Sequence, residues 1–222
     1  MKVGVDGVLV GCLANVDKAN TILDIGTGCG LVALIAAQRN DKAFVTGIDL
    51  HPESIEEATY NFKSSPFASR LAAINCNFLD FDESHRFDAL ISNPPFFDSG
   101  ITYTDSARMA ARHDCSLPMG ELLSKSERLL SPDGVITIIF PSERIDSVKA
   151  DAKAAGLFIC KQTLIRGHAE APVKRIVAEL RRENDTQDSG QETIISELSL
   201  MKKGLDPTEE YRILTKDFYI NY

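Results

Sequence analysis

The chain has 222 residues, of which 44% are hydrophobic, and this suits one domain with a sizeable core better than two complete domains. Its formal charge of −8, from 24 basic and 32 acidic side chains, excludes a protein that holds nucleic acid by overall attraction, although a local basic face remains possible. No apolar run reaches the length of a membrane span and the first residues do not form a signal peptide, so we expect a cytoplasmic protein without membrane contact.

The five cysteines are scattered along the chain, and none forms a C-x-x-C pair or stands at ligand spacing from a histidine. We therefore expect neither a disulfide framework nor a metal site. The sequence does not decide the oligomeric state, and a monomer is favoured over an oligomer.

The first part of the chain predicts the start of an α/β sheet. Residues 1–20 indicate an irregular lead-in with a short helix, and a short apolar strand follows at 21–25. The turn at 26–30 reads G-T-G-C-G and leads into a helix at 31–39. Because glycines allow a tight turn and helix N-termini offer unpaired N–H groups, this pattern indicates a nucleotide-binding site.

Polar residues follow the next strands. The strand at 43–48 ends at Asp49, which stands 23 positions after Gly26, and this spacing lets a carboxylate accept hydrogen bonds from ribose hydroxyls. A strand at 71–76 is followed by Asp80. Because ligands bind beyond the carboxyl ends of the strands in an open α/β sheet, these carboxylates predict one shared crevice.

The fourth strand, at 86–92, ends abruptly at the motif Asn-Pro-Pro-Phe of 93–96. Two prolines cannot continue a strand, because neither donates a backbone N–H and each has a restricted φ. The motif is therefore expected in the same crevice. A proline-rich strand exit whose phenyl rings only fill the core is the alternative.

The second half of the chain predicts further strands and helices. The strands at 157–165 and 173–180 are joined by a short link, which favours an antiparallel hairpin over a crossover helix. Residues 183–222 indicate a C-terminal extension whose first ten residues are polar and whose remainder has no clear assignment. The other expected elements are a helix at 119–130, a turn at 131–134, a strand at 135–140 and a helix from 141 that stops at Gly156.

Seven strands are thus expected, and the whole layout resembles the class I methyltransferases that depend on S-adenosylmethionine. The loop L-D-I-G-T-G-C-G at 23–30 is similar to the cofactor loop of that family. The resemblance implies a single Rossmann-like α/β domain over residues 1–222, with three α/β/α layers around a seven-stranded, mostly parallel sheet with one antiparallel strand. It also implies S-adenosylmethionine as the cofactor.

The same resemblance implies roles for individual residues. Asp49 is expected at the ribose hydroxyls, Asp80 at the adenine amino group and Phe81 beside the adenine ring. A turn or cap carboxylate is the alternative for Asp80. The implied cofactor-binding residues are Lys2, Asp24, Gly26, Thr27, Gly28, Gly30, Asp49, Leu50, Asp80, Phe81 and Asn93.

The Asn-Pro-Pro-Phe motif resembles that of methyltransferases that modify planar amino or amide nitrogens. The lone pair of such a nitrogen is delocalised, so the nitrogen is a poor nucleophile. The Asn93 side-chain oxygen and the Pro94 carbonyl, held rigid by the prolines, can accept hydrogen bonds from the NH₂ group and stabilise the charge that develops there. Phe96 can stack on the target ring. The expected catalytic residues are Asn93, Pro94, Pro95 and Phe96, without a metal.

Short strings along nearly the whole chain resemble the bacterial tRNA valine adenine N6-methyltransferase family, which implies an adenine of the anticodon loop, A37, as the target. They are M-K-V-G-V-D-G-V-L at 1–9, A-R-H at 111–113, P-V-K-R at 172–175 and K-D-F-Y at 216–219. Two features depart from the family. Its members usually carry a further segment before the M-K-V-G string, and Val5 stands where a threonine is typical.

An RNA-binding surface needs local positive charge. Residues 159–182 hold six basic and two acidic side chains, and Arg108 and Arg112 lie four positions apart, on one helical face. Solvated charges that protect a sheet edge from aggregation are the alternative for the hairpin. The expected RNA-binding residues are Arg108, Arg112, His113, Lys174 and Arg175.

Other functions share parts of this pattern. A methyltransferase that acts on a guanine amino group of ribosomal RNA or on a glutamine amide of a release factor is the nearest alternative, although the latter usually has an N-terminal helical domain and a tyrosine after the two prolines. A DNA adenine methyltransferase is expected to carry a further recognition domain. From another class, a dinucleotide oxidoreductase or a non-catalytic cofactor-binding protein also begins with a glycine-rich turn.

Overall fold

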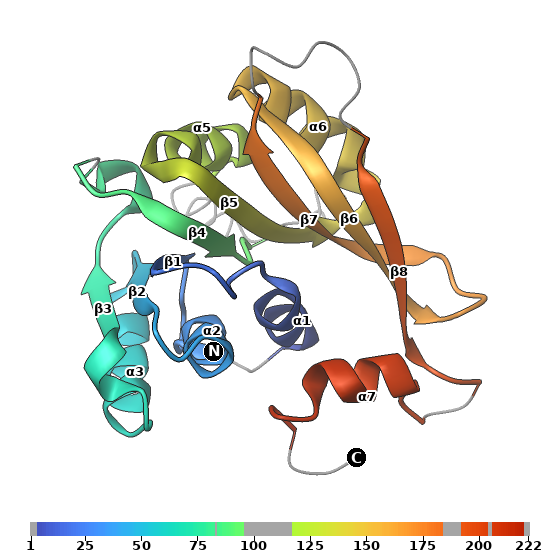
Figure 1. Cartoon of the computed structure of the whole chain (residues 1–222), viewed down its shortest axis with the longest axis horizontal. Coiled ribbons are helices and arrows are strands. Elements are labelled where there is room, and N and C mark those ends of the chain that lie inside the picture. Colours follow the sequence, from blue (N-terminus) through green and yellow to red (C-terminus); the bar gives the residue numbers. More distant parts are fainter. Residues whose placement is uncertain (1–3, 83, 96–116, 184–191, 204–205, 220–222) are drawn as a thin grey trace, which may run out of the picture.

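Eight strands in the described part of the chain form one sheet, in the order β3-β2-β1-β4-β5-β7-β6-β8 (Figure 1). The computed structural model describes residues 4–82, 84–95, 117–183, 192–203 and 206–219. Strand β7 is antiparallel to both of its neighbours, and the other neighbouring pairs are parallel. The strands are β1 Thr21–Ile25, β2 Phe44–Asp49, β3 Leu71–Asn75, β4 Phe87–Ser92, β5 Leu130–Pro141, β6 Leu157–His168, β7 Val173–Arg182 and β8 Ile194–Met201.

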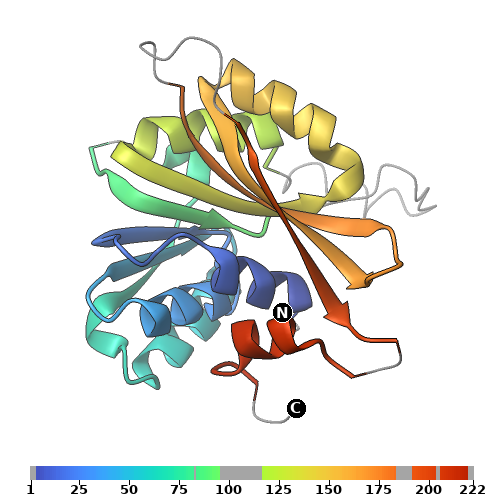
Figure 2. The same cartoon turned by 45° about the vertical axis from the view of Figure 1, so that its right-hand side comes forward.

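Helices cover both faces of this sheet, so the predicted three-layer architecture is confirmed (Figures 1 and 2). Helices α1, α2 and α3 pack on one face, α5 and α6 pack on the other, and α7 lies against α1. The helices are α1 Val5–Leu13, α2 Leu31–Arg39, α3 Pro52–Lys63, α5 Met119–Leu129, α6 Ile145–Ala154 and α7 Glu209–Thr215, with short 3₁₀ turns η1 Ala68–Arg70, η2 Phe78–Asp80 and η3 Ser142–Arg144.

The central strands are apolar because both of their sides are buried. Successive residues of a strand point to opposite faces, so Ile22 of β1 joins the core under α2, whereas Leu23 joins the core under α5. Along β4, Ile91 and Leu90 divide between the two cores in the same way. This double burial holds the carboxyl ends of β1 and β4 rigidly side by side.

The N-terminal segment contains the short helix that was expected within the lead-in. Val5–Leu13 is an α-helix, and its residues 7–12 are all buried. A Cβ added to Gly11 would lie 3.0 Å from the Ile35 side chain, so the glycine allows α1 to pack closely on α2. Glycine and valine lower the intrinsic helix propensity of this segment, so tertiary packing stabilises the helix.

The C-terminal region corrects the expected strand count, because the sheet has eight strands and not seven. The hairpin of β6 and β7 is antiparallel as predicted, but β8 then pairs in parallel with the outer side of β6. In this edge strand Leu198 is the one buried residue, and a strand with so little burial has a weak sequence signal. Helix α7 follows, and the Thr208 side chain caps it by accepting a hydrogen bond from the Tyr211 N–H at 3.2 Å.

Of two predicted breaks in the chain, the helix end at Gly156 is confirmed and the turn at 131–134 is corrected. Gly156 follows α6 with a φ of 71°, as expected for a left-handed helix end. Residues 131–134 interrupt the pairing of β4 with β5, where Phe87 pairs with Leu130 and Ala89 pairs with Val135. The predicted turn is therefore an irregularity inside one long strand.

Candidate active site

The glycine turn after β1 has the left-handed conformation that its glycines allow. The φ angles are 73° at Gly26, 56° at Gly28 and 86° at Gly30. At Gly30 the Phe62 ring also fills the place of a Cβ, whereas the space beside Gly26 is open. The N–H groups of Gly26 and Thr27 both donate to the Ile48 carbonyl at 2.9 Å, so the turn is bound to the end of β2.

Asp24 is almost fully buried beneath this turn. Its Oδ2 atom accepts hydrogen bonds from Thr27 Oγ1 at 2.6 Å and from the Ala33 N–H at 3.1 Å, so it joins the turn to the first turn of α2. Burial raises the pKa of Asp24 to about 7, because the charged form is poorly solvated there. The described hydrogen bonds of Asp24 therefore hold the glycine turn against the first turn of α2.

Asp49 lies at the end of β2, beside the same turn, and is only 8% exposed. Its Oδ2 accepts from the Gly28 N–H at 2.9 Å and its Oδ1 accepts from the His51 N–H at 2.9 Å. A carboxylate has about four acceptor positions, so these two bonds orient Asp49 and leave acceptor capacity for hydroxyl groups. Leu50 follows with 44% of its surface exposed.

The exit of β3 carries Asp80 and Phe81. Asn77 caps η2 by accepting from the Leu79 N–H at 3.0 Å, and Asp80 is the last residue of this 3₁₀ turn. Asp80 is exposed. The pKa of Cys76 is raised, first by partial burial of the thiol and then by the negative charge of Asp80. The Phe81 ring lies 6.0 Å from the Phe87 ring, centroid to centroid. Asp80 is therefore an exposed carboxylate in the turn that follows β3.

The Asn-Pro-Pro motif leaves β4 next to the glycine turn. Ser92 and Ile25 are register partners in the β4–β1 pair, and Ser92 Oγ donates to the Ile25 carbonyl at 3.0 Å. Asn93 and Gly26 therefore leave the sheet side by side. Asn93 is half-buried, Pro94 is buried and Pro95 is exposed. The motif therefore passes from the core to the surface within three residues.

The expected RNA-binding residues are only partly described. Lys174 is exposed on β7, whereas the Arg175 Nε donates to Asp6 Oδ2 of α1 at 2.9 Å in an ion pair. The guanidinium of Arg175 is thus shared with a carboxylate. Five expected site residues lie outside the described residues, namely Lys2, Phe96, Arg108, Arg112 and His113.

Several residues near the site were not singled out from the sequence. Asn75 Nδ2 donates to the carbonyls of Asp49 and Leu50, at 3.0 and 2.9 Å, and fixes the end of β2. Gly7 of α1 lies beside Asn93. The four-residue spacing of Gly7 and Gly11 was the signal in the sequence for a closely packed helix. No signal in the sequence indicated that Asp6 pairs with Arg175.

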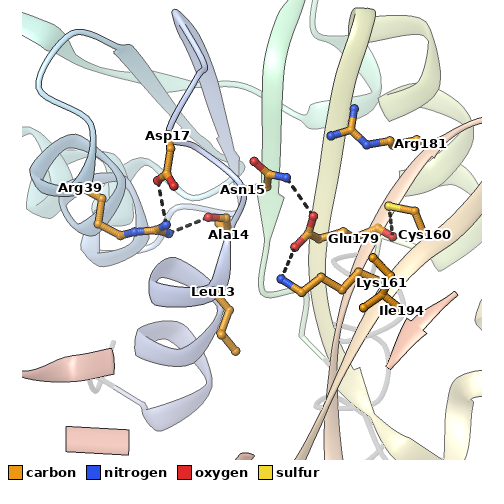
Figure 3. Close-up of a pocket in the computed structure, with 10 residues that line it drawn as sticks. All are labelled: Leu13, Ala14, Asn15, Asp17, Arg39, Cys160, Lys161, Glu179, Arg181 and Ile194. Carbon is orange, nitrogen blue, oxygen red and sulfur yellow. Dashed lines mark hydrogen bonds and ion pairs between the residues drawn. The ribbon is translucent and has the colours of Figure 1, made fainter. Parts of the chain in front are cut away.

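A hollow of about 490 Å³ lies between the segment that follows α1 and the strands β6, β7 and β8 (Figure 3). Four of its five charged side chains are paired within the hollow, whereas the fifth, Arg181, donates to the Asp133 carbonyl at 2.8 Å. Glu179 accepts from Asn15 Nδ2 and from Lys161 Nζ, both at 3.0 Å, and Arg39 pairs with Asp17 at 3.1 Å. These contacts bind the segment after α1 to α2, β6 and β7, and we assign them a structural role.

The described part of the chain holds neither a cluster of metal ligands nor a helix able to span a membrane. Within it, no three His, Cys, Asp or Glu side chains gather as a metal site would require. No helix of the described ranges has the length and apolar character needed to cross a membrane.

The strand order, the reversed strand β7, the glycine turn and the Asn-Pro-Pro exit together define a class I methyltransferase. Residues 16–214 match the methyltransferase domain family, and the chain belongs to it. A protein from Agrobacterium tumefaciens described as a predicted O-methyltransferase shares this fold, with a TM-score of 0.72 and 17% identity over 96% of both chains.

The chain also belongs to a particular branch of that class, the tRNA1(Val) (adenine(37)-N6)-methyltransferase family. The relative from Yersinia enterocolitica is 35% identical over 100% of this chain and 87% of its own length. The relative from Bacteroides fragilis strain ATCC 25285 is 36% identical over 99% of this chain and 91% of its own length. The predicted family is thereby confirmed, and S-adenosylmethionine is the cofactor of the class.

The residues at the turn suit this cofactor. The open space beside Gly26 lets a ligand approach the backbone, and the oriented Asp49 carboxylate stands where it can accept from the two hydroxyls of a ribose. Asp80 at the next strand end offers an acceptor for an amino group. The assignment of these residues to parts of the cofactor stays a prediction.

Proposed function

We propose that this enzyme transfers a methyl group to the N6 atom of adenine 37 in a valine tRNA. The support comes from curated relatives that carry this activity in their names and align with the chain over 99% or more of its length. S-adenosylmethionine supplies the methyl group. We also propose a cytoplasmic location, since tRNA is modified there in bacteria.

The observation that carries the chemistry is the register of β4 against β1. Because Ser92 pairs with Ile25, the cofactor turn and the Asn-Pro-Pro exit begin at the same level on adjacent strands. Methyl transfer needs the reacting atoms about 3–3.5 Å apart and aligned, and two rigid neighbouring strand ends are suited to provide that alignment.

Asn93 and Pro94 have the properties that activation of an adenine amino group requires. The Asn93 side-chain oxygen and the Pro94 carbonyl are acceptors, so they can hold the two N–H groups and favour the tetrahedral nitrogen that forms as the methyl group arrives. Burial of Pro94 and partial burial of Asn93 limit competition from water and strengthen these hydrogen bonds. A loop nucleotide can place its base there without breaking a duplex.

Substitution of Asn93 by alanine tests this proposal. We expect the single-turnover methylation rate of tRNA to fall roughly a hundredfold or more, with cofactor affinity changed by only a few fold. Asn15→Ala is the matched control, because Asn15 bonds to Glu179 in the hollow between the segment that follows α1 and the strands β6, β7 and β8. An Asn93→Ala enzyme with a normal rate would remove Asn93 from the catalytic site.

The substrate is tested separately with labelled S-adenosylmethionine and total tRNA, ribosomal RNA and release factor as parallel acceptors. We expect label in tRNA, at N6-methyladenosine after nuclease digestion. Label in guanine or in a release factor would instead support the nearest alternatives. A rise in melting temperature with S-adenosylhomocysteine and none with NAD would separate methyltransferase from oxidoreductase.

A further inference from the structure

The first turn of α1 forms part of the wall around Asn93. A Cβ placed on Gly7 would lie 3.9 Å from Asn93 Nδ2 and 3.5 Å from Leu31 Cδ2. The backbone of α1 therefore lies close behind the Asn93 amide. Any shift of this helical turn changes the room available to the side chain that we assign to catalysis.

This first turn is weakly held by its own hydrogen bonds. Gly4 occupies the N-cap and has no side chain with which to cap the helix, and the first bond, from the Val8 N–H to the Gly4 carbonyl, is 3.4 Å long. Asp6 also lies in this turn, where a carboxylate interacts favourably with the helix dipole. The position of the turn thus depends on tertiary contacts.

The Asp6–Arg175 ion pair is such a contact. Arg175 lies on β7 opposite Pro141, the last residue of β5, and so at the same edge of the sheet as the end of β4. The Arg175 Nε donates to Asp6 Oδ2 at 2.9 Å, across 169 positions of the chain. The two side chains are about one-third exposed, at 36% and 34%, so a pair of this kind contributes little to overall stability.

We propose that the Asp6–Arg175 pair positions the catalytic Asn93. It holds the first turn of α1 against β7, and Gly7 in that turn supports the Asn93 amide from behind. Asp6 and Arg175 are positioning residues, since they act through Asn93. This inference rests on the proposed function, because it assumes that Asn93 activates the target nitrogen.

A double-mutant cycle tests the positioning role. We expect Asp6→Ala and Arg175→Ala each to lower the single-turnover rate on the order of tenfold, because small displacements of a reacting group have large effects on rate. The double variant should be no slower than either single one, since both remove the same contact. The dissociation constant for S-adenosylhomocysteine should stay within about twofold, which a general loss of structure would not allow.

Asp17→Ala is the matched control. Asp17 also pairs with an arginine, Arg39, at 3.1 Å, but beyond the other end of α1, so its removal should leave the rate unchanged. Single effects that multiply in the double variant, or rates equal to the parent enzyme, would overturn the inference.

The salt dependence of tRNA binding separates positioning from phosphate contact. A phosphate contact adds about 0.7–0.9 to the slope of log affinity against log salt. We expect Lys174→Ala, which removes an exposed cation next to Arg175, to flatten this slope, and Arg175→Ala to leave it unchanged. A flatter slope with Arg175→Ala would assign Arg175 to RNA contact instead. If Asn93→Ala were fully active, Asn93 would not be catalytic and the positioning inference would lose its basis, whereas the proposed function itself would fail only if tRNA took up no label from S-adenosylmethionine.

Discussion

Replacement of Asp49 by alanine should weaken cofactor binding. In the structure both carboxylate oxygens already accept backbone hydrogen bonds, from Gly28 and from His51 at 2.9 Å each. Further bonds to ribose hydroxyls would be charge-assisted, and such bonds contribute about 1.5–3 kcal/mol. Loss of that amount raises the dissociation constant about 10- to 150-fold. Titration calorimetry with S-adenosylhomocysteine measures it directly.

The same substitution also leaves the Gly28 and His51 N–H groups without their carboxylate, so a second ligand is needed to separate the two effects. We therefore compare S-adenosylhomocysteine with its 2′-deoxy analogue. The parent enzyme should prefer the natural ligand, and Asp49→Ala should lose that preference because the acceptor for the 2′-hydroxyl is gone. If the variant kept the full preference, Asp49 would only support the turn, and the ribose assignment would be wrong.

The remaining predictions concern the glycine turn itself. Because the folded pKa of Asp24 is raised to about 7 from 3.8, the stability linked to its proton is fully present below pH 3.8 and disappears as pH rises through 7. The free energy of unfolding in urea, taken as Asp24→Asn minus parent, should therefore increase by roughly 1 kcal/mol per pH unit between pH 3.8 and 7. A difference that does not vary with pH would contradict the burial argument. Gly30→Ala should lose about 1–3 kcal/mol more stability than Gly26→Ala, because both have a left-handed φ but only Gly30 faces the Phe62 ring; equal losses in urea would show that the ring moves aside.

The parts of the molecule that depend on local sequence were predictable. A glycine turn, a carboxylate after a strand and two prolines act through their own backbone or that of their immediate neighbours, so Gly26, Asp49 and the motif at 93–95 were found where the structure has them, at the ends of β1, β2 and β4. The hairpin of β6 and β7 was equally local, because its short link allows no crossover.

Contacts between distant segments were decided only by the tertiary structure. β8 is half-exposed, and among the described strands it pairs with β6 alone, so its burial pattern carries little signal until β6 is in place beside it. Asp6 and Arg175 are ordinary surface charges in the sequence, and they become a pair because β7 reverses direction and brings its first residues to the edge where α1 begins. Local preferences therefore determined which groups reach the active-site edge of the sheet, whereas packing over long sequence distances determined which of those groups hold one another in place.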